Sequence, residues 1–353
     1  MPKVSVIVPC YNVAPYVETC LDSLVNQTLR DIEIICVDDK STDNTLEIIQ
    51  ERARMDTRIK VIAQPTNSGV SVARNTGIDA STGEYISFVD ADDYVDFNFF
   101  ELLYNKAFVE NLDICVSNIC EHMCDGTYRK HNDYVNRIAK GRMFFNYIQC
   151  AAIFNLDFIR KNDIRIPIGI TNGEDTVFCI KCAVFAKKID RIKDVFYHYV
   201  RRADSAEQMF YSEKQVESRI KMARAIVEFI NSVPDIPEQD YKQHFDVAFG
   251  YLTHMLFSKT TVAKLRRQSV QVAIALYQDC KYPDMYKKHT EYPYLRCADA
   301  DGFYDYLCSI NKFEKTIYVK LFKKIPLLTI QNSIDRKKIR FLGIPCIYIY
   351  EQR

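Results

Sequence analysis

Three carboxylates, Asp90, Asp92 and Asp93, directly follow the apolar run from Tyr85 to Val89. The run is short and rich in β-forming residues, which predicts a buried strand. Carboxylates packed this closely repel one another unless they are solvated or a cation lies among them. Mg²⁺ and Mn²⁺ prefer oxygen ligands and commonly share them with the phosphates of a substrate. The spacing therefore predicts a divalent-metal site that holds a diphosphate; the alternative is an acidic turn that caps the next helix, whose apolar positions begin near Phe97.

The elements before these acids predict where they lie. Apolar runs at Val4 to Val8 and Ile32 to Val37 predict buried strands, and helical patterns follow each of them. This alternation over the first hundred residues predicts an α/β fold with a parallel sheet and right-handed crossovers. The second run ends in Asp38 and Asp39, so two acid clusters reach the same edge of the sheet. Ligands bind at that edge in open α/β sheets.

The rest of the chain has weaker signals. A strand is predicted at Ile114 to Asn118, a polar loop over 119–142 and a strand-like aromatic run at Val195 to Val200. From Ser212 to about Tyr282 the apolar spacing becomes helical. We therefore expect a domain boundary near residues 205–212.

The composition excludes several classes of protein. The 353 residues are 48% hydrophobic and 26% charged, with a net charge of +1, which is typical of a globular protein and argues against a dedicated nucleic-acid binder. The 13 cysteines have no repeating frame and the N-terminus does not read as a signal peptide, which favours free thiols in a reducing cytoplasm. No apolar run reaches 18 residues, so a transmembrane helix is not expected.

Six segments in this order resemble the bacterial family-two glycosyltransferases, which have a GT-A fold. They are VSVIVPCYN (4–12), IICVDDKSTDNT (34–45), NSGVSVARNTGI (67–78), GEYISFVDADDYV (83–95), NGEDTVF (172–178) and YHYVRRADS (197–205). The resemblance is specific over about residues 1–110 and moderate over about 145–205. It implies inverting transfer of a sugar from a nucleotide-diphosphate donor, usually with Mn²⁺ or Mg²⁺.

The resemblance also implies a domain organisation. Residues 1–208 would form the GT-A domain, with a nucleotide-binding half (1–110) and an acceptor-binding, catalytic half (111–208). The resemblance does not cover the remainder of the chain, where the helical apolar spacing instead predicts that residues 209–353 form a mainly helical C-terminal module with a basic tail.

By the same resemblance, the nucleotide of a UDP-sugar would lie near the first acid cluster. Asp39 is expected to accept a hydrogen bond from a uracil-type N–H. Pro9, Tyr11 and Asn12 lie in the segment where the base would rest, and the ring of Tyr11 can stack on it.

The second acid cluster would hold the metal and diphosphate. Asp92 matches the last acid of the family's Asp-x-Asp motif and is the expected metal ligand, while Asp90 would hold the ribose, the metal or both. Arg74, in the family's Ala-Arg-Asn element, is expected to orient Asp90 or contact the donor; the alternative is a structural ion pair with an acid at the sheet edge. Asp93 has the alternative role of capping the following helix.

Inverting transfer needs a base that removes the proton of the acceptor hydroxyl. The resemblance assigns this role to the pair Glu174 and Asp175, with Asp175 as the usual base. Two adjacent acids raise each other's pKa, which suits a base that works near neutral pH. The alternative is that the pair only begins a helix, where acids favour the helix dipole.

Two residues of the last segment are also candidates. His198 would complete the metal shell, as a late histidine does in some GT-A enzymes; the alternative is a half-buried strand histidine. Arg202 matches an arginine that the family often places near the diphosphate. The preceding arginine position of the family is Val200 here, which weakens the expectation of a two-arginine clamp.

The sequence leaves two alternative functions. A nucleotidyltransferase would carry a Gly-rich, basic loop after the first strand, whereas residues 9–12 contain no Gly, Lys or Arg. A glycosyltransferase-like scaffold without activity would not be expected to retain Asp39, Asp90, Asp92 and Asp175 together. The expected partners are a UDP-sugar and a glycan or lipid-linked glycan, and nucleic acid is not expected.

The C-terminal end has a charge pattern of its own. Residues 312–353 contain ten Lys or Arg and three acids, a net charge of +7, interleaved with apolar residues. Such a segment suits the surface of an anionic bilayer. We therefore expect peripheral contact of residues 312–350 with the inner face of the cell membrane; the alternative is a hairpin or helix packed on its own domain.

Overall fold

The computed structural model describes most of the chain. It covers residues 1–131, 149–202, 213–255 and 263–310, together with short strands at 137–139, 142–144, 316–319, 328–333, 336–341 and 344–349. The chain divides into two compact units, one of Met1–Met209 with Glu217–Phe245 and one of Phe210–Val216 with Asp246–Arg353. The boundary expected between residues 208 and 209 stays a prediction, and the first unit extends beyond it.

A mixed sheet forms the first unit. Its described strands follow the order β3 (Ile59–Ala63), β2 (Ile32–Asp38), β1 (Val4–Cys10), β4 (Tyr85–Phe88), β10 (Ala152–Asn155), β6 (Ile114–His122), β11 (Ile189–Val200) and β5 (Tyr94–Val95), and β7 (Tyr128–His131) pairs with β6. The first four strands are parallel, as the alternation of strands and helices predicts. β10 is antiparallel to both of its neighbours, whereas β11 is parallel to β6.

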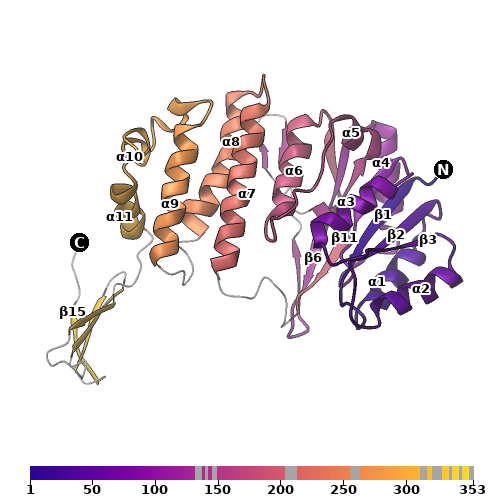
Figure 1. The fold of residues 1–353 in the computed structure, drawn as a ribbon, viewed down its shortest axis with the longest axis horizontal. Coiled ribbons are helices and arrows are strands. Elements are labelled where there is room, and N and C mark those ends of the chain that lie inside the picture. Colours follow the sequence, from indigo (N-terminus) through magenta and orange to yellow (C-terminus); the bar gives the residue numbers. More distant parts are fainter. Residues whose placement is uncertain are drawn as a thin grey trace. The chain divides into compact units, whose positions relative to one another are not determined.

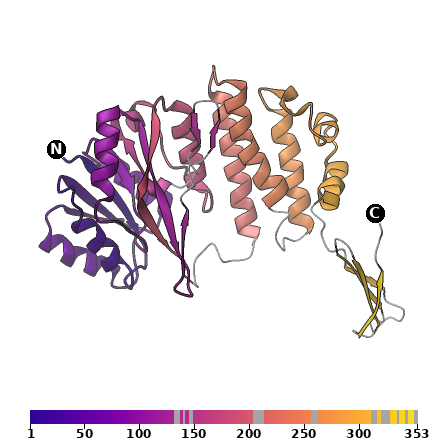
Figure 2. The same cartoon turned by 180° about the vertical axis from the view of Figure 1, so that it is seen from behind.

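Helices cover both faces of this sheet. The chain passes from β1 to β2 and from β2 to β3 through α1 (Val17–Val25) and α2 (Thr45–Met55), and then returns to the centre of the sheet through α3 (Val70–Ala80). Right-handed crossovers put α3 on the face opposite α1 and α2, and Figure 1 shows this arrangement. Figure 2 shows the same elements from behind.

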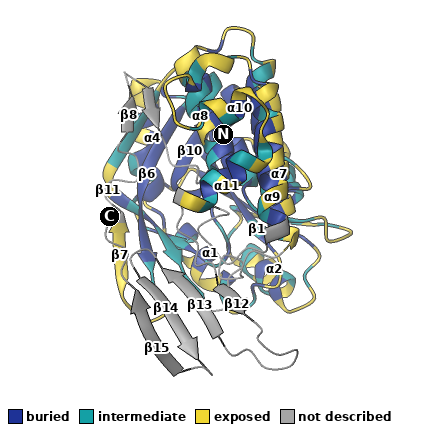
Figure 3. Ribbon diagram, turned by 90° about the vertical axis from the view of Figure 1, so that its left-hand side faces the viewer, coloured by how far each residue is buried: buried dark blue, intermediate teal, exposed yellow. Residues whose placement is uncertain are grey.

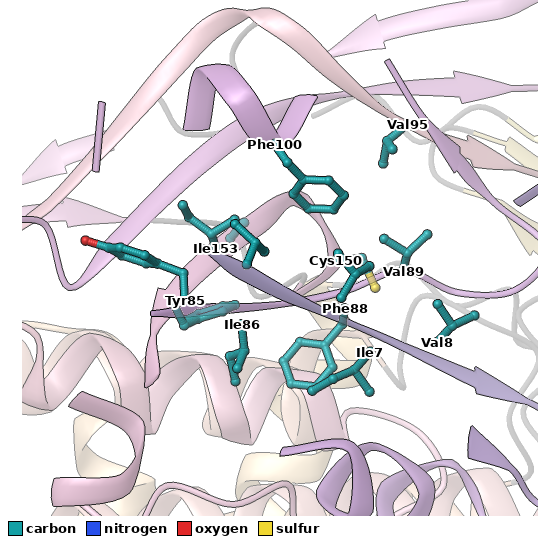
Figure 4. Close-up of a cluster of buried hydrophobic side chains, with 14 of the residues drawn as sticks. Ile7, Val8, Tyr85, Ile86, Phe88, Val89, Val95, Phe100, Cys150 and Ile153 are labelled. Carbon is teal, nitrogen blue, oxygen red and sulfur yellow. The ribbon is translucent and has the colours of Figure 1, made fainter. Parts of the chain in front are cut away.

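The core of the first unit packs against the edge of the sheet that carries Asp90, Asp92 and Asp93, which we call the acidic edge. β1, β6 and β10 are buried along nearly all of their length (Figure 3). Ile7, Phe88, Val89 and Cys150 lie in one buried cluster (Figure 4). The ring of Phe88 meets that of Phe178 edge to face at 5.5 Å between centroids, a favoured geometry for aromatic pairs. The turn that carries the acids is therefore anchored on closely packed side chains.

One prediction for this unit is wrong. Residues 119–142 were expected to form a loop, but β6 continues to His122 and then turns into β7. β8 (Arg137–Ala139) and β9 (Arg142–Phe144) follow as a two-stranded sheet. β6 pairs with β11 on one side and β7 on the other, so neighbouring strands bond its backbone and a polar sequence can still be extended.

The described part of the chain from Glu213 to Ile310 is mainly helical. Its helices are α7 (Glu213–Ser232), α8 (Glu238–Gly250), α9 (Ala263–Gln278), α10 (Tyr292–Arg296) and α11 (Ala300–Ile310). Four antiparallel strands follow: β12 (Thr316–Val319), β13 (Leu328–Ser333), β14 (Arg336–Phe341) and β15 (Ile344–Ile349). The side chains of the basic tail lie outside the described residues. No helix in the described part of the chain has both the length and the apolar character to cross a membrane.

Candidate active site

The turn after β4 carries the acidic cluster and is tied to β11. The backbone N–H of Asp93 donates to the carbonyl oxygen of Asp90 at 3.0 Å, which closes the turn. The hydroxyl of Tyr197 donates to the Asp93 carboxylate at 2.6 Å and accepts from the backbone N–H of Asp90 at 3.2 Å. Asp93 therefore fixes the turn; it does not cap α4 (Phe99–Glu110), which begins six residues later. Burial, with Asp90 and Asp92 nearby, raises the pKa of Asp93 well above its ordinary value.

Arg74 links the two predicted acidic motifs. Its guanidinium, on α3, donates to Asp90 Oδ1 at 2.7 Å and to Glu174 Oε1 at 3.0 Å. The amide oxygen of Gln149, when directed toward Arg74, accepts from it at 2.9 Å. Only 7% of the Arg74 side chain is exposed, so these acids offset the cost of burying its charge. Burial would lower the pKa of Arg74, but Asp90 and Glu174 raise it.

Asp92 lies beside Arg202, which comes from the last of the six matching segments. Arg202 pairs with Asp92 at 2.6 Å, and its guanidinium lies 4.7 Å from the ring centre of Tyr16. Burial and then the charge of Asp90 raise the pKa of Asp92, although Arg202 acts in the opposite direction. The structure thus brings Asp90, Asp92, Arg74 and Arg202 together at one edge of the sheet, as expected for a diphosphate site.

Asp39 organises the loop between β3 and α3. Its two carboxylate oxygens accept from the backbone N–H of Ser68 at 2.8 Å and of Gly69 at 2.7 Å. Gly69 has φ +90°, a conformation that side chains with a Cβ rarely adopt. Only 3% of Asp39 is exposed. Each oxygen can still accept a further hydrogen bond, so the predicted contact with a uracil-type N–H is compatible with this loop and stays a prediction.

The segment after β1 is held against the loop after β2. Asn12 has φ 52°, in the left-handed region that asparagine tolerates, and its side-chain oxygen accepts from the backbone N–H of Thr42 at 2.8 Å. Its own N–H donates to the Ser41 hydroxyl at 3.1 Å. Tyr11 is 46% exposed, so its ring is available for stacking, and Pro9 lies next to the end of β1.

The pair Glu174 and Asp175 begins α6 (Glu174–Phe185), directly after Gly173. Gly173 has φ +94°, and a Cβ there would meet Met222 Sδ at 2.3 Å. The two acids differ in their surroundings: Glu174 pairs with Arg74, whereas Asp175 accepts from the backbone N–H of Thr176 at 2.7 Å. Burial, followed by the charge of Glu174, raises the pKa of Asp175 to about 7. This is the range expected of a general base.

His198 faces away from the acidic cluster. Successive side chains of a strand point to opposite faces, and it is the neighbouring Tyr197 that contacts Asp93. The ring nitrogens of His198 contact Asp96 Oδ1 at 2.8 Å and His122 Nε2 at 2.9 Å. The structure therefore does not bring His198 together with Asp90 and Asp92, and its role as a ligand in that group stays a prediction.

Three residues of the site were not predicted as site residues. Tyr197 lies inside the last matching segment, but its uncharged side chain gives no signal in the sequence of a role in the site. Gln149 and Cys150 follow a segment without a recognisable pattern, and the Cys150 thiol donates to Asp90 Oδ2 at 3.5 Å. The sequence holds no signal for these two, because their contacts with residues on other elements form only in the folded chain.

Comparison with known proteins defines the family. The sequence matches the profile described as glycosyl transferase family 2 over residues 5–191. The uncharacterized glycosyltransferase EpsJ of Bacillus subtilis is 34% identical over 244 residues, which are 65% of this chain and 70% of EpsJ. The poly(ribitol-phosphate) beta-glucosyltransferase of Bacillus spizizenii is 35% identical over 209 residues, 57% of this chain and 33% of that protein. The chain belongs to glycosyl transferase family 2.

A solved structure confirms the predicted GT-A fold. Residues 1–349 of S. aureus TarS, in complex with UDP-GlcNAc, match this structure with a TM-score of 0.71. The match covers 92% of this chain and 98% of the TarS chain, at 23% identity.

Proposed function

We propose that this glycosyltransferase moves a sugar from a UDP-sugar to a hydroxyl of a glycan or lipid-linked glycan, with inversion at the anomeric carbon. The observation that carries the proposal is the Asp90–Arg74–Glu174 chain, because it joins the predicted diphosphate site to the helix start that bears Asp175. A donor whose diphosphate is bound at this site would thus present its sugar near Asp175. One relative is named a poly(ribitol-phosphate) beta-glucosyltransferase, which supports a hydroxyl of a polymer as the acceptor.

The acidic edge also fits a Mg²⁺ or Mn²⁺ ion. The available donors are the carboxylate oxygens of Asp90 and Asp92, the hard ligands that these ions prefer. Burial and mutual repulsion raise the pKa of Asp92, and a divalent cation would relieve both effects. When bound, the ion would neutralise negative charge on the departing diphosphate.

Side chains of this protein would carry out the other steps of the proposed transfer. Arg202 lies beside Asp92 and would contact the phosphates of the donor. Arg74 holds Asp90 and Glu174 in place while it is itself buried. Asp175, ionised above about pH 7, would take the proton of the acceptor hydroxyl as that oxygen attacks the anomeric carbon.

A nucleotide-sugar panel tests the proposed activity. The protein is incubated with Mn²⁺ and each of a set of UDP-, GDP- and dTDP-sugars, and the released nucleotide is measured by mass spectrometry. We expect slow release of UDP from at least one UDP-sugar, because water can replace the acceptor. Release of pyrophosphate from a nucleoside triphosphate and a sugar phosphate, without any UDP release, would instead favour a nucleotidyltransferase.

Asp39→Ala is expected to weaken binding of UDP. A hydrogen bond to a charged acceptor contributes roughly 1.5–3 kcal/mol, or about 10- to 150-fold in affinity. Calorimetry with UDP and CDP separates base recognition from a general effect on the Ser68–Gly69 loop, because cytosine has no N–H at the corresponding ring position. Wild type should prefer UDP, and the variant should lose that preference. An unchanged ratio of the two affinities would exclude base recognition by Asp39.

We also propose that residues 312–350 attach the protein peripherally to anionic membranes. The support is the net charge of +7 over residues 312–353, at about 1 kcal/mol for each basic residue near such a surface. Co-sedimentation with anionic liposomes should be strong at low salt and weak with neutral lipids. A chain that ends after Asn311 should lose the binding; equal, negligible binding to both lipid types would rule the attachment out.

A further inference from the structure

A second group of metal-binding side chains lies on the other face of β11. Strand pairing places Cys120 of β6 opposite His198 of β11, and His198 opposite Tyr94 of β5. His122 is two residues after Cys120 on β6, so its side chain lies on the same face. Three adjacent strands thus present a thiol, two imidazoles and a phenol in one patch, with Cys120 buried and the two histidines partly exposed.

The potential ligand atoms of this patch lie close together. Cys120 Sγ and one nitrogen of each histidine are all within 4.8 Å of one another. His198 Nδ1 and His122 Nε2 are 2.9 Å apart, and the Tyr94 hydroxyl is 3.1 Å from the same nitrogen of His122. Tetrahedral coordination at zinc–nitrogen distances separates two nitrogens by about 3.3 Å. For these two nitrogens, metal binding would therefore require only a small outward movement.

Asp96 prepares His198 for metal binding. Its carboxylate contacts His198 Nε2 at 2.8 Å and also accepts from the backbone N–H of Phe196 at 2.8 Å, which holds it in place. A proton on Nε2 is then shared with Asp96, and the lone pair of Nδ1 points toward His122. A carboxylate behind a histidine is the usual outer partner of a histidine ligand. The face of the His198 ring is held as well, since it stacks on Tyr94 at 4.4 Å between centroids.

We propose that Cys120, His122 and His198 bind a Zn²⁺-type transition-metal ion, separate from the Mg²⁺ or Mn²⁺ expected at Asp90 and Asp92. The two sites differ in donor chemistry. Thiolate and imidazole favour Zn²⁺, whereas the carboxylates of the acidic edge favour Mg²⁺ and Mn²⁺. Water or the Tyr94 hydroxyl would supply the fourth ligand of a tetrahedral site.

The ionisation of the ligands is consistent with this assignment. Burial, and then the proximity of His198, lowers the pKa of His122, a direction that favours the neutral imidazole. Burial raises the pKa of the Cys120 thiol, but the positive charge of Lys130 acts in the opposite direction. Lys130 is on β7, in register with Cys120 on β6. The bound ion would itself favour the thiolate.

The site would join β6 to the strand that positions the acidic turn. His198 follows Tyr197, which holds Asp93, and Asp96 ends the short segment that begins with Asp93. A metal bound on one face of β11 would therefore restrain the segment that contacts Asp90 and Asp93 on the other. Its expected effect is on stability and on the positioning of the turn, not on the transfer chemistry itself.

Cobalt substitution tests the site on the full-length protein. The chain is stripped with a chelator and titrated with Co²⁺, whose bonds to thiolate give a strong near-ultraviolet charge-transfer band. Tetrahedral Co²⁺ also gives intense visible bands, unlike the six-coordinate site with oxygen ligands expected at Asp90 and Asp92. We expect one equivalent of Co²⁺ to produce both features and Zn²⁺ to displace it. Zn²⁺ should also raise the melting temperature.

Matched variants identify the ligands. Cys120→Ser should abolish the charge-transfer band, while Cys124→Ser, which removes an exposed thiol four residues away, should leave it unchanged. Asp96→Asn should weaken Zn²⁺ binding by about 10- to 100-fold, the usual effect of losing an outer partner. His289→Gln, which changes a histidine outside this patch, should have no effect.

Three results would overturn the proposal. They are the absence of a thiolate band in the folded wild type, a band that survives Cys120→Ser, and a band lost in Asp92→Ala but not in His122→Gln. The last result would place the cobalt at the acidic edge, where Cys150 lies beside Asp90.

Discussion

Asp92→Ala is expected to lower sugar transfer by about 10³-fold or more, because the variant would lose a carboxylate ligand of the proposed ion, which would stabilise the leaving diphosphate by several kcal/mol. It also leaves Arg202 without the anion that it now faces at 2.6 Å. Initial rates at saturating donor, over a range of Mn²⁺ concentrations, measure the effect.

A surface acid provides the control for this variant. Asp79 forms an exposed ion pair with Arg165, so Asp79→Ala should keep the wild-type rate. Thermal melting shows whether Asp92→Ala is folded. Normal turnover with Mn²⁺ in a folded Asp92→Ala protein would exclude Asp92 as a metal ligand.

Asp175→Asn should bind the donor almost normally but transfer the sugar about 10²–10⁴-fold more slowly, because an amide cannot accept the proton of the acceptor hydroxyl. The KM for the donor should change little, since Glu174 and not Asp175 contacts Arg74. A collapse of donor affinity with little change in kcat would mean that Asp175 is a binding residue.

The pKa of Asp175 predicts the pH dependence of the reaction. As the proposed base, Asp175 must be ionised, and its pKa is raised to about 7, so kcat/KM of the wild type should fall as the pH is lowered through about 7. Asp175→Asn should lose this limb of the profile. A wild-type rate that stays constant down to pH 5 would contradict the role of Asp175 as the base.

The same shift predicts an effect on stability. The pKa of Asp175 is raised from an ordinary value of 3.8, so its ionisation destabilises the folded state progressively as the pH rises from about 4 to 7. Above pH 7 the full cost is present, and Asp175→Asn avoids it. The variant should therefore melt at the same temperature as wild type or higher at pH 8, which separates lost catalysis from lost folding.

The sequence predicts the acidic edge because its signals are local. A short apolar run that ends in acids predicts both the strand and the position of the acids, and this holds for β2 with Asp39 and for β4 with Asp90 and Asp92. The helices between these strands follow from their apolar spacing. The N-terminal half of the sheet is confirmed for this reason.

Contacts between distant segments could not be predicted in this way. Arg74 lies 100 residues before Glu174, and Tyr197 lies 104 residues after Asp93. No periodic pattern in the sequence predicts that these side chains meet. The sequence therefore leaves open whether Arg74 contacts the donor, orients Asp90 or forms a structural ion pair. β7 was not predicted because the sequence from Tyr128 to His131 is polar and residues 128–130 are exposed; the strand is extended because it pairs with β6.

The anomeric configuration of the first sugar released is the most direct test of an inverting, Asp175-assisted transfer. An α-linked UDP-sugar that the panel identifies as a donor is incubated with Mn²⁺, and the product is followed by proton NMR before it equilibrates. In a single displacement the attacking oxygen approaches the face opposite the diphosphate. The proposal therefore predicts the β-anomer as the initial product, formed much more slowly by Asp175→Asn. Initial release of the α-anomer would contradict it.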